Sequence, residues 1–246
     1  MSAILSVEAI SRRFGGLWAL RQVSFSIPRG QIVGLVGPNG AGKTTLFNVL
    51  VGLHPPSSGV VRLEEREISG RSPHWICAAG MTKTFQNVAL FLDMTVLDNV
   101  LAGALLRNPL REARELAGRM LERVGISAIA RKLAADLTLP ERSRVELARA
   151  LCTQPKVLLL DEIMAALTHA EMSEMLALIR QLRDGGITFL VVEHHMRAIL
   201  SLCDRILVLH FGELIADGTP EAVVRDERVV TAYLGRSQGA SGERHA

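Results

Sequence analysis

The sequence predicts an α/β fold in which helices cover a sheet of buried parallel strands, and three observations carry this prediction. Two continuous apolar runs, 156–160 and 187–192, have the length and the β-branched side chains of such strands. A helical pattern over 169–183 separates them and ends at a pair of glycines. Upstream, a strand pattern, a glycine-rich loop and a helical pattern follow one another over 31–50. Strands that alternate with helices in this way are typical of parallel sheets.

The other elements surround this core in chain order. Further strand patterns occur at 4–10, 23–27, 60–63, 205–209 and 213–216. From 95 to 125 the apolar residues recur every three to four positions, which indicates helices. We therefore expect one domain over residues 1–235, with a helical part inserted at about 88–153. The polar, Gly/Ser-rich tail over 236–246 is expected to be disordered.

Composition limits the functions that this chain can have. It has 246 residues, of which 48% are hydrophobic, so it can bury a substantial core. A formal charge of +3 is too small to imply a nucleic-acid partner, and 4% aromatic residues argue against a base-stacking surface. Cys77, Cys152 and Cys203 lack metal-ligand spacing and are expected to be reduced core thiols of a cytosolic protein. No apolar run approaches the length of a membrane-spanning helix, and the N-terminus lacks the basic segment of a signal peptide. If the chain works at a membrane, we expect a partner to hold it there from the water side.

The glycine-rich loop has the pattern of a phosphate-binding loop, G-x-x-x-x-G-K-[ST]. Its nucleotide-binding residues are expected to be Gly37, Pro38, Asn39, Gly40, Ala41, Gly42, Lys43, Thr44 and Thr45. Glycines let successive backbone N–H groups point inward, and the helix N-terminus and Lys43 add positive charge. The hydroxyl of Thr44 is suited to Mg²⁺. We therefore expect the chain to bind a nucleoside triphosphate.

Two carboxylates, Asp161 and Glu162, follow the apolar run that begins at residue 157. In open α/β sheets, ligands bind at the carboxyl ends of the strands, so both side chains are expected beside the phosphate loop. Asp161 would hold Mg²⁺ through water. Glu162 would orient or deprotonate the attacking water. Together with the loop, this pair favours hydrolysis of the triphosphate.

At this point the order of motifs resembles that of the ATPase subunit of an ATP-binding-cassette (ABC) transporter, over residues 5–234. The resemblance implies the α/β core of a P-loop NTPase, a small antiparallel β subdomain and a helical signature subdomain. It also implies roles for three residues outside the phosphate loop. Phe14 occupies the place of an aromatic that stacks on adenine. Gln86 matches a glutamine that reaches Mg²⁺ and senses the membrane partner. His194 matches a switch histidine that contacts the γ-phosphate.

Within this family, several strings are similar to the importers of branched-chain amino acids and related small polar solutes. They are Arg13-Phe14-Gly15-Gly16-Leu17, Thr84-Phe85-Gln86-Asn87 and Tyr233-Leu234-Gly235. The resemblance implies membrane permease subunits that contact the apolar segment Val88–Leu92. It also implies a second ATPase subunit, either a relative or a second copy, and indirectly a periplasmic solute-binding protein. The expected location is the cytoplasmic face of the inner (plasma) membrane, as a peripheral subunit.

Three segments depart from the family pattern. One is the turn after Glu162, where Ile163 stands in place of the usual Pro. The family signature is Leu-Ser-Gly-Gly-Gln, and this chain has Leu137-Thr138-Leu139-Pro140-Glu141 in its place. Pro140 has no N–H to offer, and Glu141 puts a carboxylate where the family has a neutral amide. The D-loop, 165–168, lacks its usual terminal Asp or Asn. The resemblance implies that these segments act on the site of the partner subunit. If the partner has a standard signature, we expect this chain's own site to be competent and its partner's site to be weaker. Two copies of this chain would instead form two weakened sites. Two functions stay open: a transport ATPase, and a non-hydrolysing, nucleotide-dependent regulatory subunit.

Overall fold

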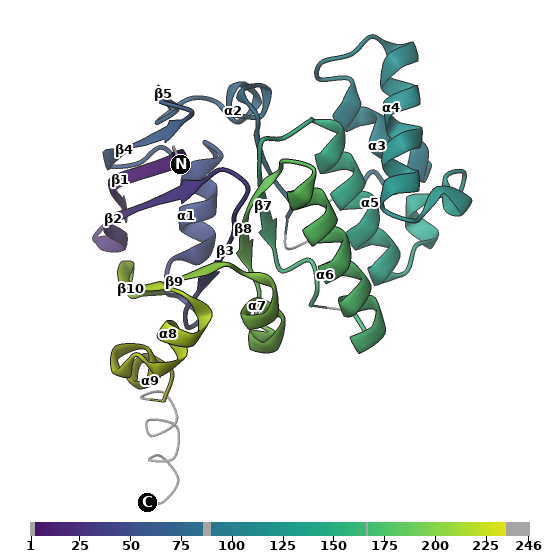
Figure 1. Cartoon of the computed structure of the whole chain (residues 1–246). Helices are drawn as coiled ribbons and strands as arrows, with labels where there is room; N and C mark the ends of the chain where they lie inside the picture. Colours follow the sequence, from purple (N-terminus) through teal and green to yellow (C-terminus); the bar gives the residue numbers. More distant parts are fainter. Residues whose placement is uncertain (1–2, 86–89, 166, 235–246) are drawn as a thin grey trace, which may run out of the picture.

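The computed structural model describes residues 3–85, 90–165 and 167–234, in which a larger β-sheet is flanked by helices and by a smaller outer β-sheet (Figure 1). The larger sheet consists of β3 (Ile32–Val36), β6 (Met81–Lys83), β7 (Val157–Asp161), β8 (Thr188–Val192), β9 (Arg205–His210) and β10 (Glu213–Gly218). Its strand order is β10-β9-β3-β8-β7-β6, and every neighbouring pair is parallel except β9 with β10. This confirms the predicted α/β class.

The smaller sheet is antiparallel and is built from the N-terminal part of the chain. Its strands are β1 (Ala3–Phe14), β2 (Leu17–Pro28), β4 (Ser58–Leu63) and β5 (Arg66–Glu67), in the order β2-β1-β4-β5. The sequence pattern predicted much shorter strands at 4–10 and 23–27. The difference arises because register shifts interrupt the β1–β2 pairing, and each shift breaks the simple alternation of apolar and polar residues.

Neighbouring side chains of β3 belong to two different hydrophobic clusters, which shows that the larger sheet is covered on both faces. Val33 and Leu35 join one hydrophobic cluster, which includes the antiparallel sheet and α1 (Lys43–Leu50). Ile32 and Val36 join the other cluster, which includes α6 (His169–Asp184) and α7 (Met196–Leu202). This two-sided burial explains why the parallel strands appear in the sequence as continuous apolar runs.

Three of the remaining helices form one group. Helices α3 (Val96–Ala104), α4 (Leu110–Arg123) and α5 (Leu139–Cys152) pack against one another at one end of the molecule (Figure 1). They fall inside the expected helical insert, whose bounds at 88 and 153 stay a prediction, as do those of the domain. Helix α2 (Pro73–Ala79) precedes β6, and α8 (Pro220–Arg225) and α9 (Glu227–Leu234) follow β10. Short 3₁₀ turns occupy Ser127–Ile129 and Ala134–Asp136. Across the described ranges, no helix has both the length and the hydropathy to cross a membrane.

Candidate nucleotide site

The carboxyl ends of β3, β7 and β8 lie side by side, because these strands are parallel neighbours in the order β3-β8-β7. The loop that follows β3 contributes to a cavity of about 510 Å³. The cavity is lined by Leu17, Trp18, Ala19, Arg21, Asn39, Gly40, Ala41, Gly42, Lys43, Thr44, Thr45, Glu162, His194 and Phe211. The sheet topology therefore brings the phosphate loop, the predicted catalytic carboxylate and the predicted switch histidine together.

Close packing explains two of the glycines in the phosphate loop. A Cβ atom on Gly37 would lie 2.0 Å from the carbonyl oxygen of Leu209, so no larger residue fits there. Gly42 has φ of 107° as the N-cap of α1, and a Cβ atom there would lie 2.6 Å from the carbonyl oxygen of Ala19. The loop is thus held tightly against β9 and the β1–β2 hairpin.

Lys43 is buried, with 8% of its surface exposed. Its Nζ donates to the carbonyl oxygen of Gly37 at 2.7 Å and to that of Pro38 at 3.2 Å. The ammonium charge is therefore held against the loop backbone. Thr44 and Thr45 belong to the first turn of α1 and line the same cavity.

Glu162 and His194 are in direct contact. His194 Nε2 lies 2.6 Å from Glu162 Oε1, and the two side chains are 49% and 13% exposed, respectively. Glu162 has φ of 54°, a left-handed conformation that costs a residue with a side chain free energy. Such strain persists only where surrounding contacts enforce it, and it is common at catalytic sites.

Asp161, at the end of β7, is 2% exposed. Its backbone N–H donates to Thr84 Oγ1 at 3.0 Å, and its carboxylate lies 3.8 Å from Nζ of Lys83. Burial raises the pKa of Asp161, and the positive charge of Lys83 opposes that rise. Lys83 also donates to Asn48 Oδ1 at 3.0 Å, so it is fixed between α1 and β7. No sequence pattern singles out Lys83, because a lone lysine before Thr84 matches no motif.

A second buried carboxyl group, Glu193, lies next to the switch histidine and is 4% exposed. Its Oε1 accepts the backbone N–H of Met164 at 2.8 Å. Burial raises the pKa of Glu193 to about 7. Its Oε2 is buried and has no hydrogen-bond partner within the described part of the chain. The position of Glu193 in the chain carried no signal of its own, since buried glutamate is recognisable only in the fold.

The structure does not bring every predicted residue to the cavity. Phe14 does not line it; its ring lies 5.3 Å from that of His54 and is covered by the guanidinium of Arg12 at 4.5 Å. Trp18, four residues later on β2, lines the cavity instead. Gln86 lies outside the described residues. The stacking role of Phe14 and the role of Gln86 stay predictions.

Comparison with known proteins identifies the family. The model described as "ABC transporter" matches residues 20–165, more than half of the chain. The chain is 39% identical to the high-affinity branched-chain amino acid transport ATP-binding protein BraF of Pseudomonas aeruginosa, over 95% of this chain and 98% of that protein. The chain belongs to the ABC transporter family. It is an ATP-binding cassette ATPase, and this membership implies membrane permease partners.

Other comparisons agree with this assignment. LivG of Escherichia coli, which carries the same description as BraF, is 38% identical over 95% of this chain and 98% of that protein. The solved ADP conformation of MJ1267, an ATP-binding cassette of an ABC transporter, has a TM-score of 0.88 and 32% identity, covering 96% of this chain and all of that one. A second model, described as "Branched-chain amino acid ATP-binding cassette transporter", matches residues 213–238.

The altered signature of this cassette forms the start of α5. Thr138 is the N-cap, and its hydroxyl accepts the N–H of Glu141 at 3.4 Å. The Glu141 carboxylate accepts the N–H of Thr138 at 2.7 Å and pairs with Lys132 at 3.2 Å. This capping box lowers the pKa of Glu141, chiefly through the Thr138 N–H. Glu141 is therefore engaged within its own chain.

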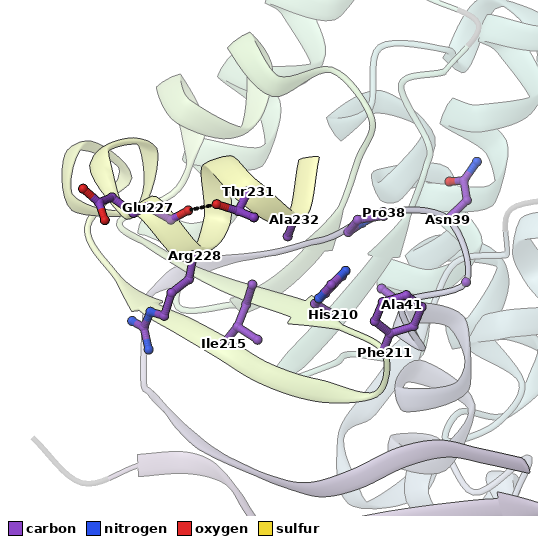
Figure 2. Close-up of a pocket in the computed structure, with 11 residues that line it drawn as sticks. Pro38, Asn39, Ala41, His210, Phe211, Ile215, Glu227, Arg228, Thr231 and Ala232 are labelled. Carbon is purple, nitrogen blue, oxygen red and sulfur yellow. Dashed lines mark hydrogen bonds between the residues drawn. The ribbon is translucent and has the colours of Figure 1, made fainter. Parts of the chain in front are cut away.

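A second cavity, of about 710 Å³, adjoins the cassette's phosphate loop (Figure 2), and four of its lining residues also line the first cavity. Pro38 and Ala41 form one wall, and the β9–β10 turn with His210 and Phe211 forms another. Thr231 and its neighbours on α9 close it, and the Thr231 hydroxyl donates to the Glu227 carbonyl oxygen at 2.8 Å. Residues of α9 and β10 that line this cavity belong to the segment 213–238. The segment matched by the branched-chain amino acid cassette model thus lines the same cavity as the phosphate loop.

Proposed function

We propose that this chain is the ATP-hydrolysing subunit of an importer for branched-chain amino acids or related small polar solutes. The observation that best supports hydrolysis is the 2.6 Å contact between Glu162 and His194, which line the same cavity as the phosphate loop. The solute class rests on the match of residues 213–238 and on the descriptions of BraF and LivG.

In this proposal the loop 37–45 binds the triphosphate, and Lys43 neutralises phosphate charge. Glu162 accepts a proton from the attacking water or orients that water. His194 contacts both Glu162 and the γ-phosphate and so fixes their relative positions. The residue types fit Mg²⁺, because the Thr44 hydroxyl at the start of α1 and the Asp161 carboxylate at the end of β7 are hard oxygen ligands. Gln86 would complete this set. Mg²⁺ would supply charge neutralisation on the phosphate oxygens.

The same proposal assigns the permease contact to a cavity of about 440 Å³ between the sheet core and the helical group. Its walls include Phe85, Phe91, Gly103 and Glu146. Phe91 is 55% exposed, an apolar side chain that a docked partner would cover. Of the predicted contact segment Val88–Leu92, residues 88 and 89 lie outside the described residues. A second cassette and a periplasmic binding protein complete the assembly, at the cytoplasmic face of the plasma membrane.

The alternative function, a non-hydrolysing regulatory subunit, is favoured by the altered signature. The contact between Glu162 and His194 argues against it, because a subunit that only binds nucleotide has no need of an assembled carboxylate–histidine pair.

The deciding experiment is the substitution Glu162→Gln in the purified full-length chain. The amide keeps the shape but cannot accept the water's proton, so ATP turnover should fall by roughly a hundredfold or more while ATP affinity is retained. Turnover is measured by phosphate release and affinity by calorimetry. His194→Ala should also lose turnover, whereas the exposed neighbour His195→Ala is the matched control and should not. A Glu162→Gln variant as active as the wild type would exclude this site.

A further inference from the structure

Two adjacent strand ends carry the residues of the hydrolytic pair, and backbone hydrogen bonds tie them together. Glu162 follows β7, and its N–H donates to the carbonyl oxygen of Val192 at 2.9 Å, at the end of β8. His194 lies two residues beyond Val192. The distance between Glu162 and His194 therefore depends on how these two strand ends are held.

Glu193 supplies a second tie at the same place. Its carboxyl oxygen Oε1 accepts the N–H of Met164 at 2.8 Å, two residues after Glu162. Met164 is fully buried, and Glu193 is 4% exposed, so water cannot replace this bond. The turn 162–164 is thus fixed to the end of β8 at both of its ends.

The backbone of the turn explains why a second tie is needed. Glu162 has a left-handed φ of 54°, which an unconstrained glutamate rarely adopts. With the Met164 N–H left unpaired, the turn would lose a buried hydrogen bond and could relax toward an ordinary conformation. Relaxation would swing the Glu162 side chain away from His194.

We propose that Glu193 is a positioning residue for ATP hydrolysis, whose buried carboxyl group holds the turn 162–164 so that Glu162 faces His194. This inference rests on the proposed function of the pair. Glu193 does not line the cavity that holds the phosphate loop, so it acts through the backbone and not on the nucleotide.

Two substitutions of Glu193 distinguish the effect of side-chain length from the effect of charge. Glu193→Gln keeps the length and an oxygen acceptor for Met164 but removes the charge. Glu193→Asp keeps the charge but is shorter by one methylene, so it cannot reach the Met164 N–H. We expect Glu193→Gln to retain turnover within about threefold and Glu193→Asp to lose roughly tenfold to a hundredfold, the worth of one buried hydrogen bond to a charged group. The KM for ATP should stay near that of the wild type in both.

An NMR measurement tests the same inference without requiring turnover. The imidazole signal of His194, assigned with His194→Ala, should shift in Glu162→Gln because its partner changes. We expect Glu193→Asp to shift this signal and Glu193→Gln to leave it in place. If the wild-type chain hydrolyses no ATP, the proposed function fails, and the imidazole signal still decides the role of Glu193.

A matched control comes from the opposite end of the sheet. Asp204 Oδ2 accepts the N–H of Ile32 at 2.8 Å, also a carboxylate bond to a strand backbone. Asp204→Ala removes this bond and should cost stability without changing turnover per folded chain or the His194 signal. The inference is overturned if Glu193→Asp hydrolyses ATP like the wild type with an unmoved His194 signal. It is equally overturned if Glu193→Gln is as impaired as Glu193→Asp.

Discussion

The phosphate loop lines the cavity beside Glu162, and the family pattern assigns the start of α5 to the nucleotide of the partner subunit. The backbone N–H groups of these two segments are paired differently. The loop contains glycines at 37, 40 and 42 and a buried lysine, which leaves a curled backbone around the cavity. At the start of α5, the Glu141 N–H is paired with the Thr138 hydroxyl, and Pro140 has none. A region that satisfies its own donors is a stable helix start and a poor phosphate ligand. The difference supports an assembly in which this chain hydrolyses its own ATP and serves its partner's ATP less well.

The largest expected effect comes from rebuilding the start of α5. Changing Thr138, Leu139, Pro140 and Glu141 to the family sequence Ser-Gly-Gly-Gln should raise the turnover of an assembly made from this chain alone by about a hundredfold. The reason is that one preorganised N–H aimed at developing charge is worth about 3 kcal/mol. Turnover is compared by phosphate release at equal ATP occupancy.

The same change removes the bond between Glu141 and Lys132, so its cost must be measured separately. Glu141→Gln alone keeps a residue suited to a capping box and is the matched variant. Loss of this partly exposed ion pair should cost at most about 1 kcal/mol in both variants, read from urea unfolding. A folded, dimeric variant with the full family signature and no gain in turnover would show that the altered signature is a tolerated local variant.

A smaller effect, on stability, follows from the raised pKa of Glu193. Its pKa is about 7 in the folded chain, against an ordinary value of about 4.3 for an unfolded glutamate. Between these values the folded state binds more protons than the unfolded state, so Glu193 makes folding less favourable as the pH rises from about 4 to about 7. Glu193→Gln removes this dependence. Its stability relative to the wild type should increase over that interval by up to about 3 kcal/mol and then stay level.

Urea unfolding at a series of pH values measures this difference. The comparison uses the Glu193→Gln and wild-type chains at each pH, so that other titrating groups cancel. A difference that is flat from pH 4 to pH 8 would mean that folding does not raise the pKa of Glu193 above its unfolded value, so that the carboxyl group is ionised in the folded chain at neutral pH. The positioning role would then be carried by a carboxylate.

The sequence predicted most of the sheet and the phosphate-binding edge, because these depend on local patterns. The runs at 156–160 and 187–192 became β7 and β8 within one residue at each end. Strand β6 was not predicted, because a strand of three residues is too short to show a period. Glu193 and Lys83 were not identified, since their importance comes from burial and from partners distant in the chain. The ring contacts of Phe14 could not be predicted either, because they arise from a loop at His54 that the sequence does not place.

The smallest expected effect is on ATP affinity, and it concerns two aromatic residues near the phosphate loop. The resemblance to the family assigns adenine stacking to Phe14, but Trp18 lines the cavity and Phe14 contacts Arg12 and His54. Stacking of a base on an aromatic side chain is worth about 1–3 kcal/mol. We therefore expect Trp18→Ala to weaken ATP binding roughly tenfold and Phe14→Ala to weaken it much less.

Fluorescence reports on this comparison directly, because the chain has two tryptophans and the other, Trp75, lies on α2 against Arg71. In a Trp75→Phe background the remaining emission comes from Trp18 alone, and a base stacked on the indole should quench it on addition of ATP. Adding tripolyphosphate is the control, since it fills the phosphate loop without a base and should leave the emission unchanged. If ATP binds with full affinity, leaves the Trp18 emission unchanged and loses affinity in Phe14→Ala, then the Phe14 ring leaves Arg12 when nucleotide arrives. The base subsite is in that case formed as the nucleotide binds.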